Sequence, residues 1–227
     1  MAMPQNGKKK KAEPKHNLPP NELGHTLIID ETIHDDERFG NEYVLGGVLL
    51  ESRNVLKFGE ISEIRYKGTE LKFHDICDLE FRIGILDEAA SVVKSYYSVT
   101  TTKPKNCKWS RKEDRNVHRN SLKRIIEDVS ADEDSDIHLI IDFNNKAKSG
   151  TVTRITEHVA LHDNKNITYV MIKSRESFQL MTNDFPVGAM GQYYNRNDKQ
   201  YVDHFGKKAK RSQLDEEEAI KDIVLDV

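Results

Sequence analysis

Two aliphatic segments of the chain end in aspartate. The sequence LIID occurs twice, ending first at Asp30, which is followed by Glu31, and again at Asp142. An ionised carboxylate at the end of an apolar strand is costly unless it is paired, hydrogen-bonded or bound to a cation. Because both segments end in the same way, we expect their carboxylates to share one partner.

Two further acids extend this set. Glu70 lies in TELKF and Asp184 lies in TNDFPVGAM. Several carboxylates at one point raise each other's pKa unless divalent cations bind between them. Hard oxygen ligands favour Mg²⁺ or Mn²⁺. The acids therefore predict a magnesium or manganese site whose ligands are Asp30, Glu70, Asp142 and Asp184.

Simpler structural explanations exist for each acid. An Asp after a strand is often a turn former or a helix N-cap, and the chain holds 38 acidic residues, so two similar tripeptides can arise by chance. Asp184 stands two residues before Pro186 and fits an N-cap well, because proline is favoured in the first turn of a helix. Both interpretations of these acids remain open at this level.

The elements that must position the acids alternate along the chain. Short β-branched and aliphatic runs predict strands, and apolar residues at helical spacing predict helices. The strands are expected at 26–30, 43–50, 96–102, 136–142 and 167–172, and the helices at 78–94, 114–129, 150–162 and 178–194. This alternation predicts an α/β fold with helices on both faces of a sheet. If the strands that end at Asp30 and Asp142 are parallel neighbours, their carboxylates face each other at the carboxyl edge.

Charge divides the chain into three parts. Residues 1–22 are rich in Lys, Pro and Asn and predict a disordered basic arm, residues 23–204 form the expected domain, and 205–227 form a charged tail that has room for one helix. The net charge is −3, but residues 1–20 carry +4, which leaves −7 for the remainder. An acidic body does not attract nucleic acid through its overall field. Binding of nucleic acid would therefore depend on a local basic surface.

One basic stretch supplies such a surface. Its residues, which we call the basic patch, are Lys103, Lys105, Lys108, Arg111 and Lys112 around the aromatic Trp109. Cations that flank a stacking aromatic residue are typical of single-strand contacts, although a basic run is often only a solvated loop.

Composition also bears on the compartment. The chain has two widely separated cysteines, no apolar run of about 18 residues and no apolar leader at its N-terminus. We therefore expect a cytoplasmic protein with reduced thiols that does not associate with membranes. The sequence does not define its oligomeric state.

The order of these segments resembles a known family. IIDE, then YVLGGVLL, ELKF, LIID and finally SRESFQLMTNDFPVGAM is similar to the bacterial and phage family called domain of unknown function 3800, within the ribonuclease H-like superfamily. The matching residues are Asp30, Glu70, Asp142 and Asp184. The sequence departs from the family where Thr32 replaces the usual serine, and where four residues rather than two separate Gln179 from Asp184.

The resemblance implies a ribonuclease H-like mixed sheet flanked by helices, and a nuclease that cleaves phosphodiester bonds of RNA or DNA with two metal ions. It also implies a role for Lys72, in ELKF, which would either hold the scissile phosphate or only neutralise the acidic cluster. Two other functions remain open: a non-catalytic module of the same fold that binds nucleic acid or protein, and a metal-dependent hydrolase of nucleotides or small phosphates.

Overall fold

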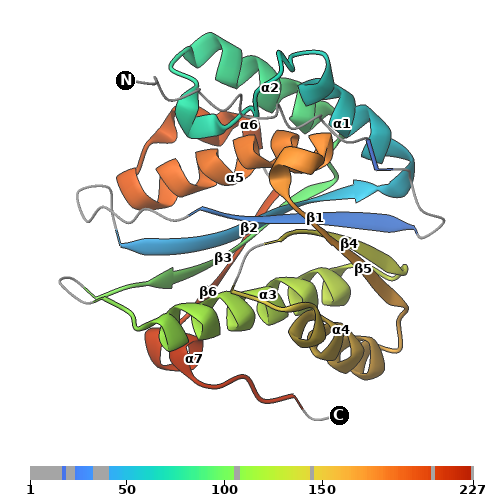
Figure 1. The fold of residues 1–227 in the computed structure, drawn as a ribbon, viewed down its shortest axis with the longest axis vertical. Helices are drawn as coiled ribbons and strands as arrows, with labels where there is room; N and C mark the ends of the chain where they lie inside the picture. Colours follow the sequence, from blue (N-terminus) through green and yellow to red (C-terminus); the bar gives the residue numbers. More distant parts are fainter. Residues whose placement is uncertain are drawn as a thin grey trace, which may run out of the picture.

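Six strands form one mixed sheet between two layers of helices (Figure 1). The computed structural model describes residues 17–18, 24–32, 41–104, 108–143, 146–205 and 208–225. The strands are β1 (His25–Thr32), β2 (Glu42–Glu51), β3 (Ser95–Thr102), β4 (Ile137–Asp142), β5 (Ile167–Ile172) and β6 (Ala209–Leu214). They lie in the order β5-β4-β1-β2-β3-β6.

The central strand β1 has neighbours of both orientations. It pairs antiparallel with β2 and parallel with β4, and Ile29 is aligned with Ile141. Asp30 and Asp142 follow these two residues directly. The condition for a shared site is therefore met, because the two aspartates end parallel neighbouring strands at the same edge of the sheet.

Helices cover the sheet on both faces, as the alternation predicts. One layer contains α1 (Val55–Glu63), α2 (Leu79–Val92), α5 (Phe178–Arg196) and α6 (Val202–Phe205), and the other contains α3 (Arg111–Asp132), α4 (Ser149–Asp163) and α7 (Glu216–Ile220) (Figure 1). None of the helices in the described ranges is long and apolar enough to span a membrane.

Side-chain alternation along the strands divides the core into two clusters. Ile28 and Ile140 are buried in the cluster under α1, α2 and α5, whereas Ile29 and Ile141 are buried in the cluster under α3 and α4. Successive side chains of a strand point to opposite faces. Asp30 and Asp142 therefore lie on the α5 face, and Glu31 lies on the α3 face.

Among the described α-helices and strands, α1, the one-turn α6 and β6 were not predicted from the sequence. Helix α1 is short and packs against α5, and β6 is an edge strand with the sequence AKRSQL that pairs parallel with β3. Of the six residues in β6, only Leu214 is buried. A charged edge strand of this kind lacks the apolar alternation that identifies a strand from sequence.

The predicted N-terminal arm lies outside the described residues except for Asn17 and Leu18. The backbone N–H of Leu18 donates to Oε1 of Gln179 at 3.2 Å, and its carbonyl oxygen accepts from Nε2 of Gln179 at 3.2 Å. This part of the arm is therefore attached to α5.

Helix α5 begins earlier than one interpretation of the sequence suggests. Ser177 is the N-cap residue, its Oγ accepting from the N–H of Leu180 at 3.3 Å, and the helix continues through Pro186. The interpretation of Asp184 as an N-cap is therefore wrong. An internal proline removes one backbone hydrogen bond and costs about 3 kcal/mol. Nearly every residue in the first four turns of α5 is buried, so packing offsets that cost.

A close approach brings a loop onto α5 beside Asp184. A Cβ atom at Gly188 would lie 2.6 Å from a ring atom of Phe73, which is completely buried in the short 3₁₀ helix Phe73–Asp75. Only glycine at this position lets the segment that carries Glu70 and Lys72 pack against α5.

We expect Gly188→Ala to lower the free energy of unfolding by about 1–3 kcal/mol, because the added methyl group must displace the Phe73 ring. Gly84→Ala is the matched control, because Gly84 lies in α2 with open space around it and alanine favours a helix by about 1 kcal/mol. Urea denaturation measures both variants. Equal stability of the two variants would contradict the close approach.

Candidate metal centre

The first two acids of the site are fixed by backbone groups at the ends of their strands. Asp30 is only 7% exposed, and its Oδ1 accepts from the N–H of Glu31 at 2.7 Å. Oδ1 of Asp142 accepts from the backbone N–H of Ser174 at 2.8 Å, in the short 3₁₀ helix that follows β5. The donor to Asp30 thus comes from its own strand, β1, and the donor to Asp142 comes from the segment just after the neighbouring strand, β5.

Asp184 reaches the same region from the middle of α5. Its Oδ2 accepts from the backbone N–H of Phe73, so the helix and the loop before α2 are joined at this residue. In that loop, Nζ of Lys72 lies 3.6 Å from Oε1 of Glu70. The loop therefore brings a fourth carboxylate and a cation to Asp184.

The pKa values show that these acids interact. Burial raises the pKa of Asp30 well above its ordinary value, and the charges of Asp184 and Asp142 raise it further. Burial raises the pKa of Asp184 to about 6, opposed by the N–H of Phe73 and the charge of Lys72. Burial also raises the pKa of Asp142, opposed by its hydrogen bond to Ser174. The structure thus brings Asp30, Asp142 and Asp184 into electrostatic contact, and Glu70 acts on Asp184.

The donor chemistry of this site suits a hard divalent cation, since every candidate ligand is a carboxylate. Asp30 is buried, Asp142 and Asp184 are half-buried, and the charge of another acid acts on each of the three. Within the described ranges, however, no three Asp, Glu, His or Cys side chains lie close enough together to hold a metal ion. The three aspartates instead accept hydrogen bonds from backbone N–H groups. The residues therefore fit a cation chemically. Each hydrogen bond uses one carboxylate oxygen, so ligation would require the side chains to move closer together but not to give up these donors.

A second polar cluster lies directly behind Asp30 on the α3 face. Oε2 of Glu31 accepts from the hydroxyl of Tyr43 at 3.0 Å, lies 3.0 Å from Nδ1 of His118, and accepts from Nζ of Lys146 at 3.3 Å. We call these four residues the Glu31 network. Burial acts to raise the pKa of Glu31, but His118, Lys146 and Tyr43 together hold it below its ordinary value.

Sequence reasoning identified Glu31 but missed its three partners. They come from β2, from α3 and from the loop after β4, so no local spacing links them to Glu31. The only available signal was the position of Glu31 itself, since a second acid at a strand end must lie on the face opposite Asp30 and needs partners there.

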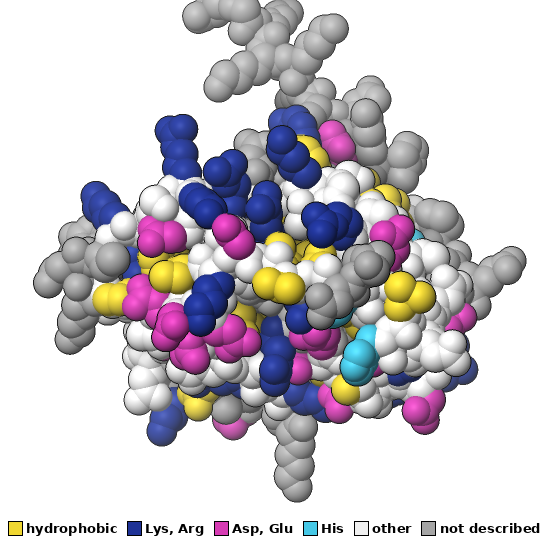
Figure 2. Space-filling view, turned by 90° about the horizontal axis from the view of Figure 1, so that it is seen from below, with side chains coloured by type: hydrophobic (Ala, Val, Ile, Leu, Met, Phe, Trp, Pro, Cys, Tyr) yellow, Lys and Arg dark blue, Asp and Glu magenta, His cyan; other side chains and the backbone are white. Residues whose placement is uncertain are grey.

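The basic patch is partly occupied by contacts within the protein. Trp109 is half-buried, its ring lies 6.4 Å from that of Tyr43, and its Nε1 donates to Glu216 at 3.3 Å. Nζ of Lys103 lies 5.8 Å from the Trp109 ring centroid, and Lys112 pairs with Asp222 at 2.8 Å. Lys108 and Arg111 are exposed, and Lys105 lies outside the described residues. On the face that bears α3, α4 and α7, basic side chains lie among acidic ones (Figure 2).

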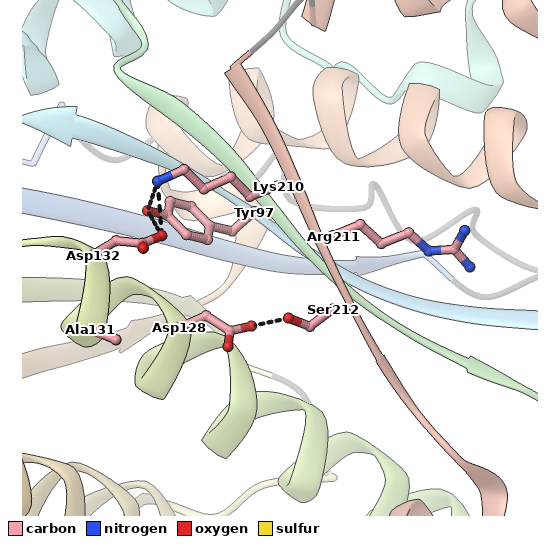
Figure 3. Close-up of a pocket in the computed structure, with 7 residues that line it drawn as sticks. All are labelled: Tyr97, Asp128, Ala131, Asp132, Lys210, Arg211 and Ser212. Carbon is pink, nitrogen blue, oxygen red and sulfur yellow. Dashed lines mark hydrogen bonds and ion pairs between the residues drawn. The ribbon is translucent and has the colours of Figure 1, made fainter.

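A hollow between α3 and β6 is a rival location for a site (Figure 3). Its polar groups bond to one another: Lys210 and Tyr97 both donate to Asp132, and Ser212 donates to Asp128. Three strand spacings, about 14 Å, separate β6 from β1. We therefore do not assign the chemistry of the strand-end acids to this hollow.

Comparison with known proteins identifies the fold. No protein-family model matches the sequence, and no curated protein sequence matches it either. Among solved structures, ribonuclease H2 from Pyrococcus horikoshii OT3 is similar over 82% of this chain and 81% of its own, with 11% identity and a TM-score of 0.51. Ribonuclease HII from Archaeoglobus fulgidus, solved in complex with PCNA, gives 9% identity and a TM-score of 0.47 over 81% of each chain. Bst-RNase HIII in complex with Mn²⁺ gives 12% identity and a TM-score of 0.42, over 82% of this chain and 56% of that one. The first likeness and the sheet topology confirm the predicted ribonuclease H-like mixed sheet flanked by helices.

The raised pKa of Asp184 makes stability depend on pH. With a folded-state pKa of about 6 against an ordinary 3.8, the folded protein binds this proton more tightly than the unfolded chain does. The resulting stabilisation is complete below about pH 4 and is lost as pH rises through about 6. We compare the free energies of unfolding of wild type and Asp184→Asn in EDTA. Between pH 4 and pH 7, we expect wild type to lose up to about 3 kcal/mol relative to the variant, because only wild type has this proton to lose. Urea denaturation of both proteins across this range measures it, and parallel pH profiles would contradict the raised pKa.

Proposed function

We propose that this protein is a divalent-metal-dependent nuclease that cleaves phosphodiester bonds by a two-metal mechanism. Asp30, Glu70, Asp142 and Asp184 would hold Mg²⁺ or Mn²⁺. One observation carries the proposal: three aspartates from two strands and a helix lie on one face at the carboxyl edge of the sheet, and their pKa values are raised. Burying this much like charge is costly unless a cation offsets it.

When bound, a pair of divalent ions would activate a water molecule and stabilise the leaving oxygen of the substrate. The residues of the chain supply the remaining functions. The N–H groups of Ser174 and Phe73 would orient the carboxylates of Asp142 and Asp184. Lys72, whose side chain is 50% exposed beside Glu70, would contact a phosphate oxygen of the substrate.

The fold is compatible with a nuclease. The structure to which this chain is similar with a TM-score of 0.51 is a ribonuclease H2. That similarity extends to the fold alone, because folds host several chemistries. The strand-end carboxylates add the chemistry that a phosphodiesterase needs.

A polymeric substrate is supported by the location of the basic patch. Strand β3 ends at the same edge of the sheet as β1, two strand spacings or about 10 Å away, and leads directly to Lys103. Next to the acids, Phe143 is 44% exposed directly after Asp142, and Lys173 and Arg175 are exposed on either side of Ser174. Nucleic acid that follows this edge would meet cations and aromatic rings.

One observation favours the non-catalytic alternative, a binding module with the same fold. The described side chains do not converge into a ready group of metal ligands. A third function, hydrolysis of nucleotides or small phosphates, would use the same acids without the basic patch. Metal titration distinguishes the non-catalytic binding module from an enzyme. The size of the substrate distinguishes a hydrolase of nucleotides or small phosphates from a nuclease.

We expect isothermal titration of Mn²⁺ or Mg²⁺ to show binding to wild type and at least tenfold weaker binding to Asp142→Asn, because the substitution removes a ligand charge with little change in shape. The same variant should lose metal-dependent cleavage of RNA or DNA. Asp134→Asn is the matched control, because Asp134 is exposed just before β4, at the opposite end of the same strand. Unchanged metal binding or cleavage in Asp142→Asn would rule out the assignment.

Neutralising Lys103, Lys108 and Arg111 together should reduce cleavage of a polymer about tenfold or more at low salt, because three phosphate contacts are lost, while hydrolysis of a small phosphodiester stays unchanged. Arg53→Ala with Lys57→Ala is the control, since both lie just after β2, at the opposite edge of the sheet. Equal polymer cleavage by the patch variant and wild type would show that the patch does not contact the substrate.

A further inference from the structure

The Glu31 network joins three parts of the chain behind the proposed metal ligands. Tyr43 comes from β2, His118 from α3, and Lys146 from the loop between β4 and α4. The hydroxyl of Tyr43 also lies 2.8 Å from Nδ1 of His118, and Nζ of Lys146 also pairs with Asp114 at 3.3 Å. Glu31 is therefore held from several directions at once.

The network is buried, which makes it costly for stability alone. The side chains of Glu31 and His118 are 14% and 3% exposed, and Tyr43 is 4% exposed. In addition, Nε2 of His118 is buried and has no hydrogen-bond partner within the described part of the chain. Replacing a buried polar group of this kind by well-packed apolar residues is often neutral or stabilising. A function other than stability would account for retaining this arrangement.

Glu31 is connected to Asp30 through the backbone. The two residues are adjacent in β1 with side chains on opposite faces, and the N–H of Glu31 donates to Oδ1 of Asp30 at 2.7 Å. Any rotation of the peptide that carries this N–H would move the Asp30 carboxylate. Fixing the side chain of Glu31 therefore also fixes the orientation of the donor that Asp30 uses.

We propose that Tyr43, His118 and Lys146 are positioning residues that hold Glu31 and, through its backbone N–H, orient the Asp30 carboxylate. The link to metal binding rests on the proposed function, whereas the orientation of the Asp30 and Glu31 peptide does not. Groups beyond the ligands commonly orient metal-binding residues, and their removal costs about 10–100-fold in metal affinity.

Tyr43→Phe tests this proposal with the least disturbance, because it removes only the hydroxyl that donates to Glu31. The matched control is Tyr97→Phe. Tyr97 lies on β3, packs in the same core cluster, and donates its hydroxyl to Asp132 at 2.9 Å rather than to a member of the Glu31 network (Figure 3). Glu31→Gln, which keeps the shape of the side chain, is a second test of the same link.

The first measurement is residue-resolved hydrogen exchange of the Glu31 N–H in EDTA, under conditions where the variants have equal global stability. We expect exchange about tenfold faster in Tyr43→Phe and Glu31→Gln than in wild type, and no change in Tyr97→Phe. Equal exchange in Tyr43→Phe and Tyr97→Phe would overturn the proposal.

The second measurement is titration of Mn²⁺ alone into the same proteins. We expect about tenfold weaker binding to Tyr43→Phe and unchanged binding to Tyr97→Phe. Unchanged affinity in Tyr43→Phe, where wild type binds Mn²⁺, would overturn the proposal even if exchange were faster. If wild type bound no Mn²⁺, the proposed function would fail, and the exchange measurement would still decide whether the network orients Asp30.

Discussion

Negative charge buried at the end of β1 is the constraint around which the rest of the structure is arranged. Asp30 and Glu31 are adjacent, and strand alternation sends their carboxylates to opposite faces of the sheet. On the α3 face, Glu31 is matched by Tyr43, His118 and Lys146. On the α5 face, Asp30 lies among further acids that outnumber the nearby cation Lys72, and its pKa rises. The two faces therefore accommodate negative charge differently, and the excess of acids on the α5 face is the feature on which the proposed metal site rests.

Close packing of α5 on the sheet produces this excess of acids. Gly46 is aligned with Asp30 in the neighbouring strand, and a Cβ atom there would lie 2.9 Å from the end of the Met190 side chain in α5. Gly188 in α5 likewise permits a close contact, because its missing side chain leaves room for the ring of Phe73. Because both contacts are close, Asp184 in the middle of α5 comes near Asp30, and the loop with Glu70 and Lys72 comes with it.

Most of the fold was predictable because its strands and helices have regular apolar periodicity. The five strands and four helices expected from periodicity are all present, and β1 and β4 are the parallel neighbours that a shared site at Asp30 and Asp142 requires. The sequence patterns did not predict strand β6 or helix α1, for two different reasons. The first is too charged to show alternation, and the second is a short helix whose apolar residues pack on α5. The location of Asp184 within α5 was also obscured, because a proline two residues later suggested a helix start that burial of the helix overrides.

By itself, the sequence determined which residues end the strands and on which face each lies, because alternation in a strand is a local property. It therefore identified Asp30 and Asp142 as partners and placed Glu31 on the other side. Only the tertiary structure decided what each acid meets. The interaction of Asp184 with Asp30, the hydrogen bond from Phe73, and the contacts of Tyr43 and His118 with Glu31 join residues that are distant in sequence. Such contacts depend on how close the helices approach the sheet, and that distance is set by packing volume rather than by any local pattern.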